Sequence, residues 1–209
     1  MRFRELKVSG AWEVTPVIHG DSRGAFLELY KSTAFTEAVG HPFDLRQVNT
    51  SVSAPGVLRG VHFADVPPGQ AKYVTCLRGA ILDVIVDIRV GSPTFGTWDA
   101  VLLDDVNRAA VYLGEGLGHA FCALDDKTTV QYLCSSEYSP TREHGIHPLD
   151  PELAIDWPST DRHGRPMEHE LSQKDLAAPT FAEALASGLL PTWDATADYV
   201  GGLDAAARA

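Results

Sequence analysis

The sequence predicts an all-β fold, an antiparallel sandwich or barrel, followed by a short helical appendage. Between residues 8 and 135, runs of β-type residues recur with Gly, Pro, Asp and Asn between them. Their spacing of roughly 8 to 15 residues is typical of such folds. Helical patterns are few, and 209 residues suit a single domain. We therefore expect one domain over 1–209, with its core over about 3–158 and a C-terminal loop and helix over about 159–209.

The predicted strands follow one another along the chain. In order they are AFLELY, LRQVNTSVS, AKYVTCL, AILDVIVDI, TWDAVLL, AAVYLG and TTVQYLC. In AILDVIVDI, alternate residues from Leu82 to Ile88 are all apolar, whereas the other face mixes isoleucine with Asp83 and Asp87. This alternation predicts a strand with one face in a core and the other toward solvent or a site.

Two short segments have helical patterns. Ser32 is a candidate cap for a helix over TAFTEAVG, which Gly40 would end. Near the C-terminus, PTFAEALASGLL places Phe181, Leu185 and Leu189 at helical spacing. The polar stretch over 157–170 contains two prolines and predicts an exposed loop, and the final AAARA resembles a frayed tail.

Composition and charge narrow the classes of function. The formal net charge of −11 argues against duplex nucleic acid as a partner, although a local Arg and Lys cluster can still bind a pyrophosphate. Neither a membrane span nor a signal peptide is predicted, so we expect no membrane partner and a cytoplasmic location. The three cysteines, Cys76, Cys122 and Cys134, form no CxxC motif and are expected to be reduced and mostly buried.

The densest polar cluster lies between residues 47 and 74. Alternate residues of one predicted strand are polar and share a face, namely Gln47, Asn49, Ser51 and Ser53. Such a row can be a solvated face, but Arg59, His62 and Lys72 follow in the same segment. Cations beside polar groups suit an anionic, oxygen-rich ligand.

His62 and Tyr132 are candidates for proton transfer. A histidine in a β-type run is often structural, and a metal role would usually come with an HxH motif. Position 64 is Ala64 and no HxH occurs, so His119 is the one further histidine that keeps a metal in question. Tyr132 shares a strand face with Cys134 and is either a core residue or a phenol facing a site, where it would be neutral at pH 7.

Nine strings together resemble one known family. They are DSRGAFLE, QVNTSVS, GVLRGVHF, QAKYVTC, DVIVDIRVGSPTFGTW, GHAF, QYLCSSEYSPTREHGI, DPELAIDWP and LSQKD, in order from about residue 3 to 195. They are similar to the dTDP-4-dehydrorhamnose 3,5-epimerases of the cupin superfamily. The resemblance implies a cupin jelly roll, a homodimer, a dTDP-4-keto-6-deoxyhexose substrate and no metal. No cofactor is expected either, because the implied reaction moves no hydride.

The same resemblance implies roles for individual residues. His62 matches the catalytic base, Tyr132 the general acid, Lys72 the lysine near the sugar keto oxygen, and Asp175 the carboxylate that pairs with the histidine. His119 matches a histidine near the sugar. Positions that line the nucleotide and pyrophosphate site are matched by Arg23, Phe26, Glu28, Gln47, Asn49, Arg59 and Tyr138. Ala120 stands where the family usually has glycine, and we expect its methyl group near the sugar pocket.

The implied reaction is consistent with the chemistry of these residues. A C4 ketone makes the C3 and C5 protons acidic, so a base on one face and an acid on the other can invert each carbon. An epimerase acting at C3 alone is the nearest alternative. A metal-dependent cupin oxygenase or isomerase and a silent sugar-binding cupin remain as more distant ones. We also expect FRELKVSGAWEV to lack a place in a minimal jelly roll and to extend the partner's sheet in the dimer.

Overall fold

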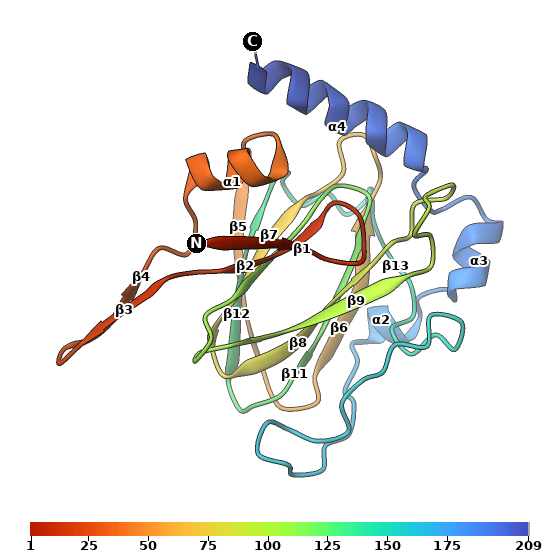
Figure 1. Cartoon of the computed structure of the whole chain (residues 1–209). Helices are drawn as coiled ribbons and strands as arrows, with labels where there is room; N and C mark the ends of the chain where they lie inside the picture. Colours follow the sequence, from red (N-terminus) through yellow and green to blue (C-terminus); the bar gives the residue numbers. More distant parts are fainter. Residues whose placement is uncertain (209) are drawn as a thin grey trace.

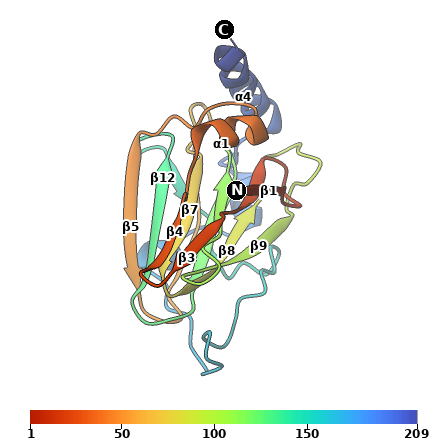
Figure 2. The same cartoon turned by 60° about the vertical axis from the view of Figure 1, so that its left-hand side comes forward.

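The computed structural model describes the backbone of residues 1–208 and the side chains of 1–203 and 205. It confirms the all-β prediction: two antiparallel sheets face each other as a sandwich, with the helices outside it (Figures 1 and 2). Every sequence-predicted strand is present, with ends shifted by a few residues. Figure 1 shows α4 running across the top of the sandwich, above the strands.

The larger sheet has six strands. Their spatial order is β1 (Arg2–Glu5), β2 (Ala11–Thr15), β10 (Ala110–Leu113), β7 (Lys72–Arg78), β12 (Thr128–Cys134) and β5 (Gln47–Ser53). The N-terminal segment therefore has a place in its own sheet, because β2 pairs with β10 and β1 pairs with β2. The expectation that this segment lacks such a place is wrong.

The second sheet has five strands, and a separate hairpin stands apart from both. The spatial order of the five is β13 (Glu143–Gly145), β6 (Leu58–Ala64), β11 (Gly118–Ala123), β8 (Ala80–Val86) and β9 (Trp98–Asp104). The hairpin consists of β3 (Ile18–Asp21) and β4 (Gly24–Leu27) and projects from the sandwich at the left of Figure 1. Its residues are exposed almost throughout.

The space between the sheets is divided into an apolar and a polar half. The apolar half is a cluster of buried side chains that includes Val74, Ile85, Leu103, Val111 and Phe121. These residues come from β7, β8, β9, β10 and β11, so the cluster joins the two sheets on one side. Burial of such side chains stabilises the fold by about 1.5–3 kcal/mol each.

Two further clusters cover the outer faces of the sheets. On the larger sheet, α1 (Ser32–Val39) inserts Phe35 against Tyr73 and Tyr112. On the smaller sheet, the chain after β13 packs Ile146 and Phe181 against the outward residues of β6, β8 and β11. Both sheets are thereby buried on two sides, which accounts for their largely apolar strands.

The helices differ in part from the predictions. Gly40 ends α1 in the left-handed conformation, as predicted, and its N–H donates to the carbonyl of Thr36. The prediction that Ser32 caps this helix is wrong: Ser32 is its first helical residue, and the cap position is Lys31, whose side chain makes no capping bond.

Three helices follow the strands, namely α2 (Gln173–Leu176), α3 (Phe181–Ala186) and α4 (Trp193–Arg208). α3 is shorter than its pattern suggested and starts with a capping box between Thr180 and Glu183. No helix was predicted over α4, because Gly201 and Gly202 weaken its helical pattern. No helix within residues 1–208 is both long and apolar enough to cross a membrane.

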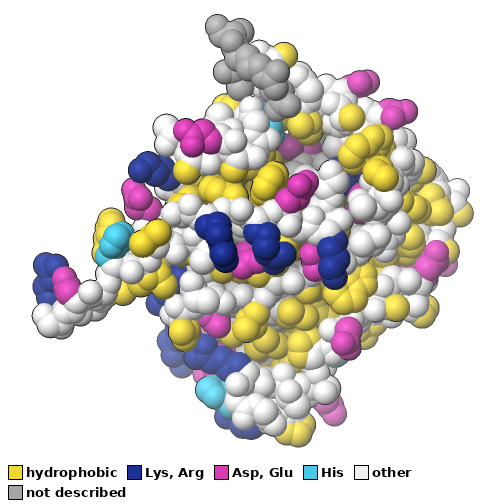
Figure 3. Space-filling model, in the orientation of Figure 1, with side chains coloured by type: hydrophobic (Ala, Val, Ile, Leu, Met, Phe, Trp, Pro, Cys, Tyr) yellow, Lys and Arg dark blue, Asp and Glu magenta, His cyan; other side chains and the backbone are white. Residues whose placement is uncertain are grey.

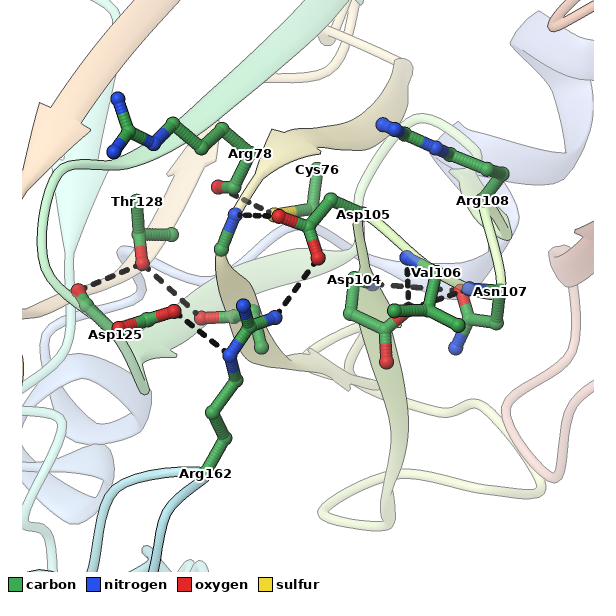
Figure 4. A network of polar contacts seen from close by, with 12 residues as sticks. Cys76, Arg78, Asp104, Asp105, Val106, Asn107, Arg108, Asp125, Thr128 and Arg162 are labelled. Atoms are coloured by element: carbon green, nitrogen blue, oxygen red, sulfur yellow. Dashed lines mark hydrogen bonds and ion pairs between the residues drawn. The ribbon is translucent and has the colours of Figure 1, made fainter. Parts of the chain in front are cut away.

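The loop over 157–170 is confirmed, and one arginine ties it to the sandwich (Figure 4). The Arg162 guanidinium donates to the carboxylate of Asp105 at 2.8 Å and lies 2.7 Å from that of Asp125. Asp105 also accepts from the backbone N–H of Gly79, so the contact extends into the β7–β8 turn. The hydrogen bond from Arg162 lowers the pKa of Asp105.

Candidate active site

The polar half of the interior holds most of the predicted site residues. β5, β7 and β12 supply one wall, and β6, β8, β11 and β13 supply the other. Lys72 lies two positions from Val74 on β7, and Tyr132 lies two positions from Val130 on β12. Residues two apart in a strand share a face, and both valines belong to the apolar cluster between the sheets, so Lys72 and Tyr132 also point inward. The residues brought together in this way are Gln47, Asn49, Arg59, His62, Lys72, His119 and Tyr132.

A β-bulge places Arg59 and His62 on the same face. Three positions apart in a regular strand, they would point in opposite directions. In β6, however, Gly60 and Val61 both lie opposite the single residue Ala120 of β11. Gly60 has φ +130°, and a Cβ atom there would lie 2.3 Å from that of Ala120. Glycine is therefore required where the bulge is tightest.

His62 forms a short hydrogen bond with Asp175. The His62 Nε2 atom lies 2.6 Å from Oδ1 of Asp175, whose side chain is 6% exposed. Ser172 caps α2 by accepting from the Asp175 N–H and donates its hydroxyl proton to Asp175 Oδ2 at 2.8 Å. Burial raises the pKa of Asp175, but the hydrogen bonds from His62 and Ser172 outweigh it and lower the pKa. An ionised Asp175 holds the proton of His62 on Nε2 and leaves the lone pair on Nδ1.

A second histidine–aspartate pair lies beside the first. His119 is the register partner of His62 on the neighbouring strand β11. Its Nε2 atom lies 2.7 Å from Oδ1 of Asp83 on β8, and both side chains are buried. The second carboxylate oxygen of Asp83 is buried and has no protein partner.

Lys72 is almost wholly buried on the opposite sheet. Cys134 is its direct cross-strand partner and lies on the same inward face. Burial lowers the pKa of the Lys72 ammonium, and the nearby Cys134, Glu143 and Asp83 partly counter this effect. A partly desolvated cation near several acceptors is suited to stabilising an oxyanion.

Tyr132 belongs to a row of polar side chains on the larger sheet. It pairs in register with Asn49, and burial raises the pKa of its phenol, so the hydroxyl is protonated near neutral pH. Asn49 accepts a 2.8 Å hydrogen bond from the side chain of Gln47, which in turn accepts from the backbone N–H of Tyr138. Tyr138 itself is 56% exposed and lies at the rim of the site.

The arrangement places proton-transfer groups on the facing sheets of this polar half, which is referred to below as the cleft. His62 with Asp175 stands on the smaller sheet, and Tyr132 stands on the larger one. Among the side chains that the structure describes (residues 1–203 and 205), no three His, Cys, Asp or Glu groups are placed to hold one metal ion. The same cleft contains the cations Lys72 and Arg59 for an anionic ligand.

Comparison with known proteins identifies the family. The family model described as dTDP-4-dehydrorhamnose 3,5-epimerase matches residues 5–183. The chain belongs to this family. It is 61% identical over 193 residues to a dTDP-4-dehydrorhamnose 3,5-epimerase of Mycolicibacterium smegmatis, covering 92% of each chain. It is also 58% identical to a dTDP-4-dehydrorhamnose 3-epimerase of Streptomyces niveus, covering 92% of this chain and 90% of that one.

Solved structures of dTDP-4-dehydrorhamnose 3,5-epimerase relatives have the same fold. The rmlC epimerase of Mycobacterium tuberculosis is 56% identical and superimposes with a TM-score of 0.94, covering 97% of this chain and 100% of that one. ChmJ, a 3'-monoepimerase from Streptomyces bikiniensis solved with dTDP-quinovose, is 49% identical with a TM-score of 0.90, covering 95% of this chain and 98% of that one. These likenesses confirm the predicted cupin-type jelly roll and the epimerase activity.

Three residues expected at the nucleotide site of this epimerase lie outside the cleft. Arg23 and Phe26 belong to the projecting hairpin, and Glu28 follows it directly. The Arg23 side chain is 88% exposed and, within the described part of the chain, pairs with Asp21 of the same hairpin alone; Phe26 is 68% exposed. The structure does not bring these residues to the cleft of their own chain.

The expectation for Ala120 is wrong. Its methyl group is 1% exposed and packs in the cluster on the outer face of the smaller sheet, with Val61 and Val84. His119, the preceding residue, points inward, so Ala120 points away from the cleft. Ala120 is connected with the site only indirectly, because it packs against Gly60 in the bulge that places Arg59 and His62 on one face.

Several residues in the cleft were missed by the sequence analysis. Glu143 on β13 influences the pKa of Lys72, Cys134 and Tyr132, and no spacing pattern in the sequence indicated it. Asp83 carried a signal, since it interrupts an apolar face. Cys134 is buried as predicted, but it faces the site rather than the core.

Proposed function

We propose that this epimerase inverts C3 and C5 of a dTDP-4-dehydro-6-deoxyhexose through an enolate, in deoxysugar biosynthesis of the dTDP-rhamnose type. The observation that carries the proposal is the position of His62 and Tyr132 on the two facing sheets of the polar half. Inversion needs a proton removed from one face of the sugar and returned to the other. We also propose a cytoplasmic location, which the three disulfide-free cysteines support.

His62 acts as the base in this proposal. Asp175 accepts the Nε2 proton, so Nδ1 is the nitrogen that removes the C3 or C5 proton. The ionised Asp175 then stabilises the imidazolium. A charge-assisted hydrogen bond of this kind contributes about 1.5–3 kcal/mol.

Tyr132 acts as the acid, and two other groups stabilise the intermediate. The raised pKa of Tyr132 keeps its proton available for transfer to the opposite face of the enolate. Lys72 and His119 stabilise the enolate oxygen, each by about 2.7–4 kcal/mol if it behaves like a typical oxyanion donor. No hydride moves in this sequence, so the reaction needs no redox cofactor.

The polar row and Arg59 bind the nucleotide in this proposal. Arg59 donates to the Ser53 hydroxyl at 3.3 Å, is otherwise exposed, and can reach a pyrophosphate. Gln47 and Asn49 orient each other, and Gln47 also anchors the Tyr138 backbone at the rim. A contact to the phosphate acts in every state of the reaction, so its loss raises KM more than it lowers kcat.

We further propose a homodimer in which each hairpin completes the partner's site. Arg23 and Phe26 are exposed on a hairpin that is hydrogen-bonded to neither large sheet among the described strands. The outer face of edge strand β5 carries Val48 and Val52, each more than half exposed, which is unusual for a free edge and typical of an interface.

Mixing two inactive variants tests this shared site. His62→Ala damages the cleft, whereas Arg23→Ala damages the hairpin. In a mixed dimer one of the two sites combines an intact cleft with an intact hairpin, so co-expression should restore about a quarter of wild-type activity. If Arg23 served its own chain, the mixture would be as inactive as its components.

Proton NMR of the reaction in D₂O tests the function itself. With dTDP-4-keto-6-deoxyglucose, deuterium should enter both C3 and C5, and both centres should invert. Exchange confined to C3 would support the alternative of a C3-only epimerase, for which the Streptomyces niveus relative is a precedent. No exchange at either carbon would refute the epimerase proposal.

A further inference from the structure

A groove outside the catalytic cleft lies between α1 and the first turns of α4. It has a volume of about 380 Å³ and contains none of the residues assigned above to the reaction. Its lining includes the rings of Trp12, Tyr112 and Trp193 together with Glu115, His41 and Thr196. Figure 3 views the face that carries this groove, below the grey atoms, where hydrophobic and acidic side chains meet. The groove is within the size range of small-molecule sites.

A buried carboxylate provides the polar contact in this groove. Glu115 is 3% exposed, and its Oε1 atom accepts a 3.0 Å hydrogen bond from the hydroxyl of Ser135. Its Oε2 atom is also buried and has no hydrogen-bond partner among the described residues. A buried carboxylate oxygen without a donor is costly, because the group has lost its hydration. A ligand that donates a hydrogen bond would remove this cost.

The charges around the groove favour a cation. Arg89 is the one Arg or Lys among the described lining residues, and it is already neutralised. Its guanidinium donates twice to Asp87 and once to the Ser9 carbonyl, and it lies 4.7 Å from the centre of the Trp193 ring. His41 is the other basic residue of the lining, and its proximity partly offsets the rise that burial causes in the pKa of Glu115. Glu5 adds a second carboxylate to the lining.

The aromatic rings favour an organic body for that cation. Trp12, Tyr112 and Trp193 offer apolar surface, and ring faces also attract cations. An inorganic ion would leave these rings in contact with water. We propose that the groove binds a small organic ammonium ion, with Glu115 accepting its N–H and the aromatic rings contacting its carbon skeleton.

The groove is joined to the catalytic cleft through Glu115. The hydroxyl of Ser135, which donates to Glu115, also accepts from the backbone N–H of Ala71 at 2.8 Å. Ala71 and Ser135 immediately precede Lys72 and follow Cys134, respectively. Occupancy of the groove is therefore placed to affect the strand ends that hold Lys72, although binding itself does not depend on the epimerase activity.

The four tryptophans provide a way to localise binding. Trp12 and Trp193 line the groove, whereas the indole N–H groups of Trp98 and Trp157 donate to carbonyls elsewhere. We would titrate 2-phenylethylammonium to about 20 mM, since ligands of this size commonly bind in the millimolar range. The four indole N–H signals would be followed by two-dimensional NMR. Saturable shifts of the Trp12 and Trp193 signals alone are expected.

Matched ligands and variants test the role of the carboxylate. The uncharged 2-phenylethanol and the anionic 3-phenylpropanoate should each bind at least tenfold more weakly. Glu115→Gln keeps the shape of the side chain and should weaken the ammonium ion by about tenfold or more, whereas Glu37→Gln, an exposed charge-matched control on α1, should not. Melting temperatures verify that both variants fold.

A second variant keeps the test decisive if Glu115→Gln fails to fold. Ala197 is exposed on α4 and lines the groove, so Ala197→Trp should fill the space and abolish the shifts. The proposal is wrong if the indole signals do not shift, if all four shift together, or if the alcohol binds as tightly as the ammonium ion. It is also wrong if the ammonium affinity is unchanged in every groove variant that folds.

Discussion

Replacing Asp175 with asparagine separates the positioning of His62 from its presence. The variant keeps the shape of a side chain that is 6% exposed, but it removes the negative charge 2.6 Å from His62 Nε2. Loss of a hydrogen bond to a charged group costs about 1.5–3 kcal/mol, which corresponds to about 10–150-fold in rate. If the amide N–H turns toward Nε2, the proton moves to Nδ1 and the base is lost, which extends the range to about 10²–10⁴-fold.

The assay measures kcat and dTDP affinity in Asp175→Asn and in a control, Asp126→Asn. Asp126 is exposed in the turn before β12, and its carboxylate makes no hydrogen bond to any residue that the structure describes. We expect kcat to fall at least about 10-fold in the first variant, with dTDP affinity within about threefold of wild type, since Asp175 acts in the chemical step. A kcat within fivefold of the control would show that the carboxylate does not set the tautomer of His62.

Four more outcomes are expected. Tyr132→Phe should change the free energy of unfolding by no more than about 1 kcal/mol and lower the rate of inversion by about 10²–10⁴-fold. Deuterium exchange at C3, measured by NMR, should fall less than inversion. An equal fall in exchange and inversion would mean that the phenol only shapes the cleft. Gly60→Ala should destabilise by about 3 kcal/mol in urea unfolding, because its new Cβ lies 2.3 Å from that of Ala120, and adding Ala120→Gly should recover part of the loss. Arg162→Ala should lower the free energy of unfolding by about 1 kcal/mol and speed proteolysis of the 157–170 loop. An unchanged rate of cleavage would show that the Arg162 ion pairs in Figure 4 do not hold the loop against the sandwich. Burial raises the pKa of Asp87, but hydrogen bonds from surrounding donors outweigh this effect and lower the pKa below the unfolded value of about 3.9. Asp87 therefore contributes stability above that pH, and the contribution is lost as the pH falls through the folded pKa. The free energy of unfolding, measured from pH 7 to 3, should accordingly fall less steeply in Asp87→Asn than in the wild type.

The sequence predicted the strands well because their signal is local. Alternation and turn residues were sufficient to predict β5, β7, β8, β9, β10 and β12. The helix α4 was missed because Gly201 and Gly202 weaken its helical pattern and because its stability comes partly from tertiary contacts. Trp193 stacks on Arg89 and Thr196 is buried against the sandwich, and neither contact leaves a periodic pattern.

The candidate site was predictable only in part. Side-chain type and family strings pointed to His62 and Asp175, which lie 113 positions apart and meet in the structure. The bulge that turns Arg59 to the same face as His62 depends on pairing with β11, which a single strand does not reveal. The exposure of Arg23 depends on where the hairpin projects, so its sequence match could not say whether it serves its own chain.

The division of the interior into an apolar and a polar half has a consequence for local unfolding. Strands that share the apolar cluster, such as β7, β8 and β10, are held by packing from both sheets. β5 and β13 are edge strands bordering the polar half, where hydrogen bonds and a bound nucleotide replace packing. Amide hydrogen exchange should therefore be slowest in the first group and fastest in the second. Binding of dTDP should slow amide exchange chiefly at β5, because contacts with the nucleotide would stabilise this strand as apolar packing stabilises the strands of the other half.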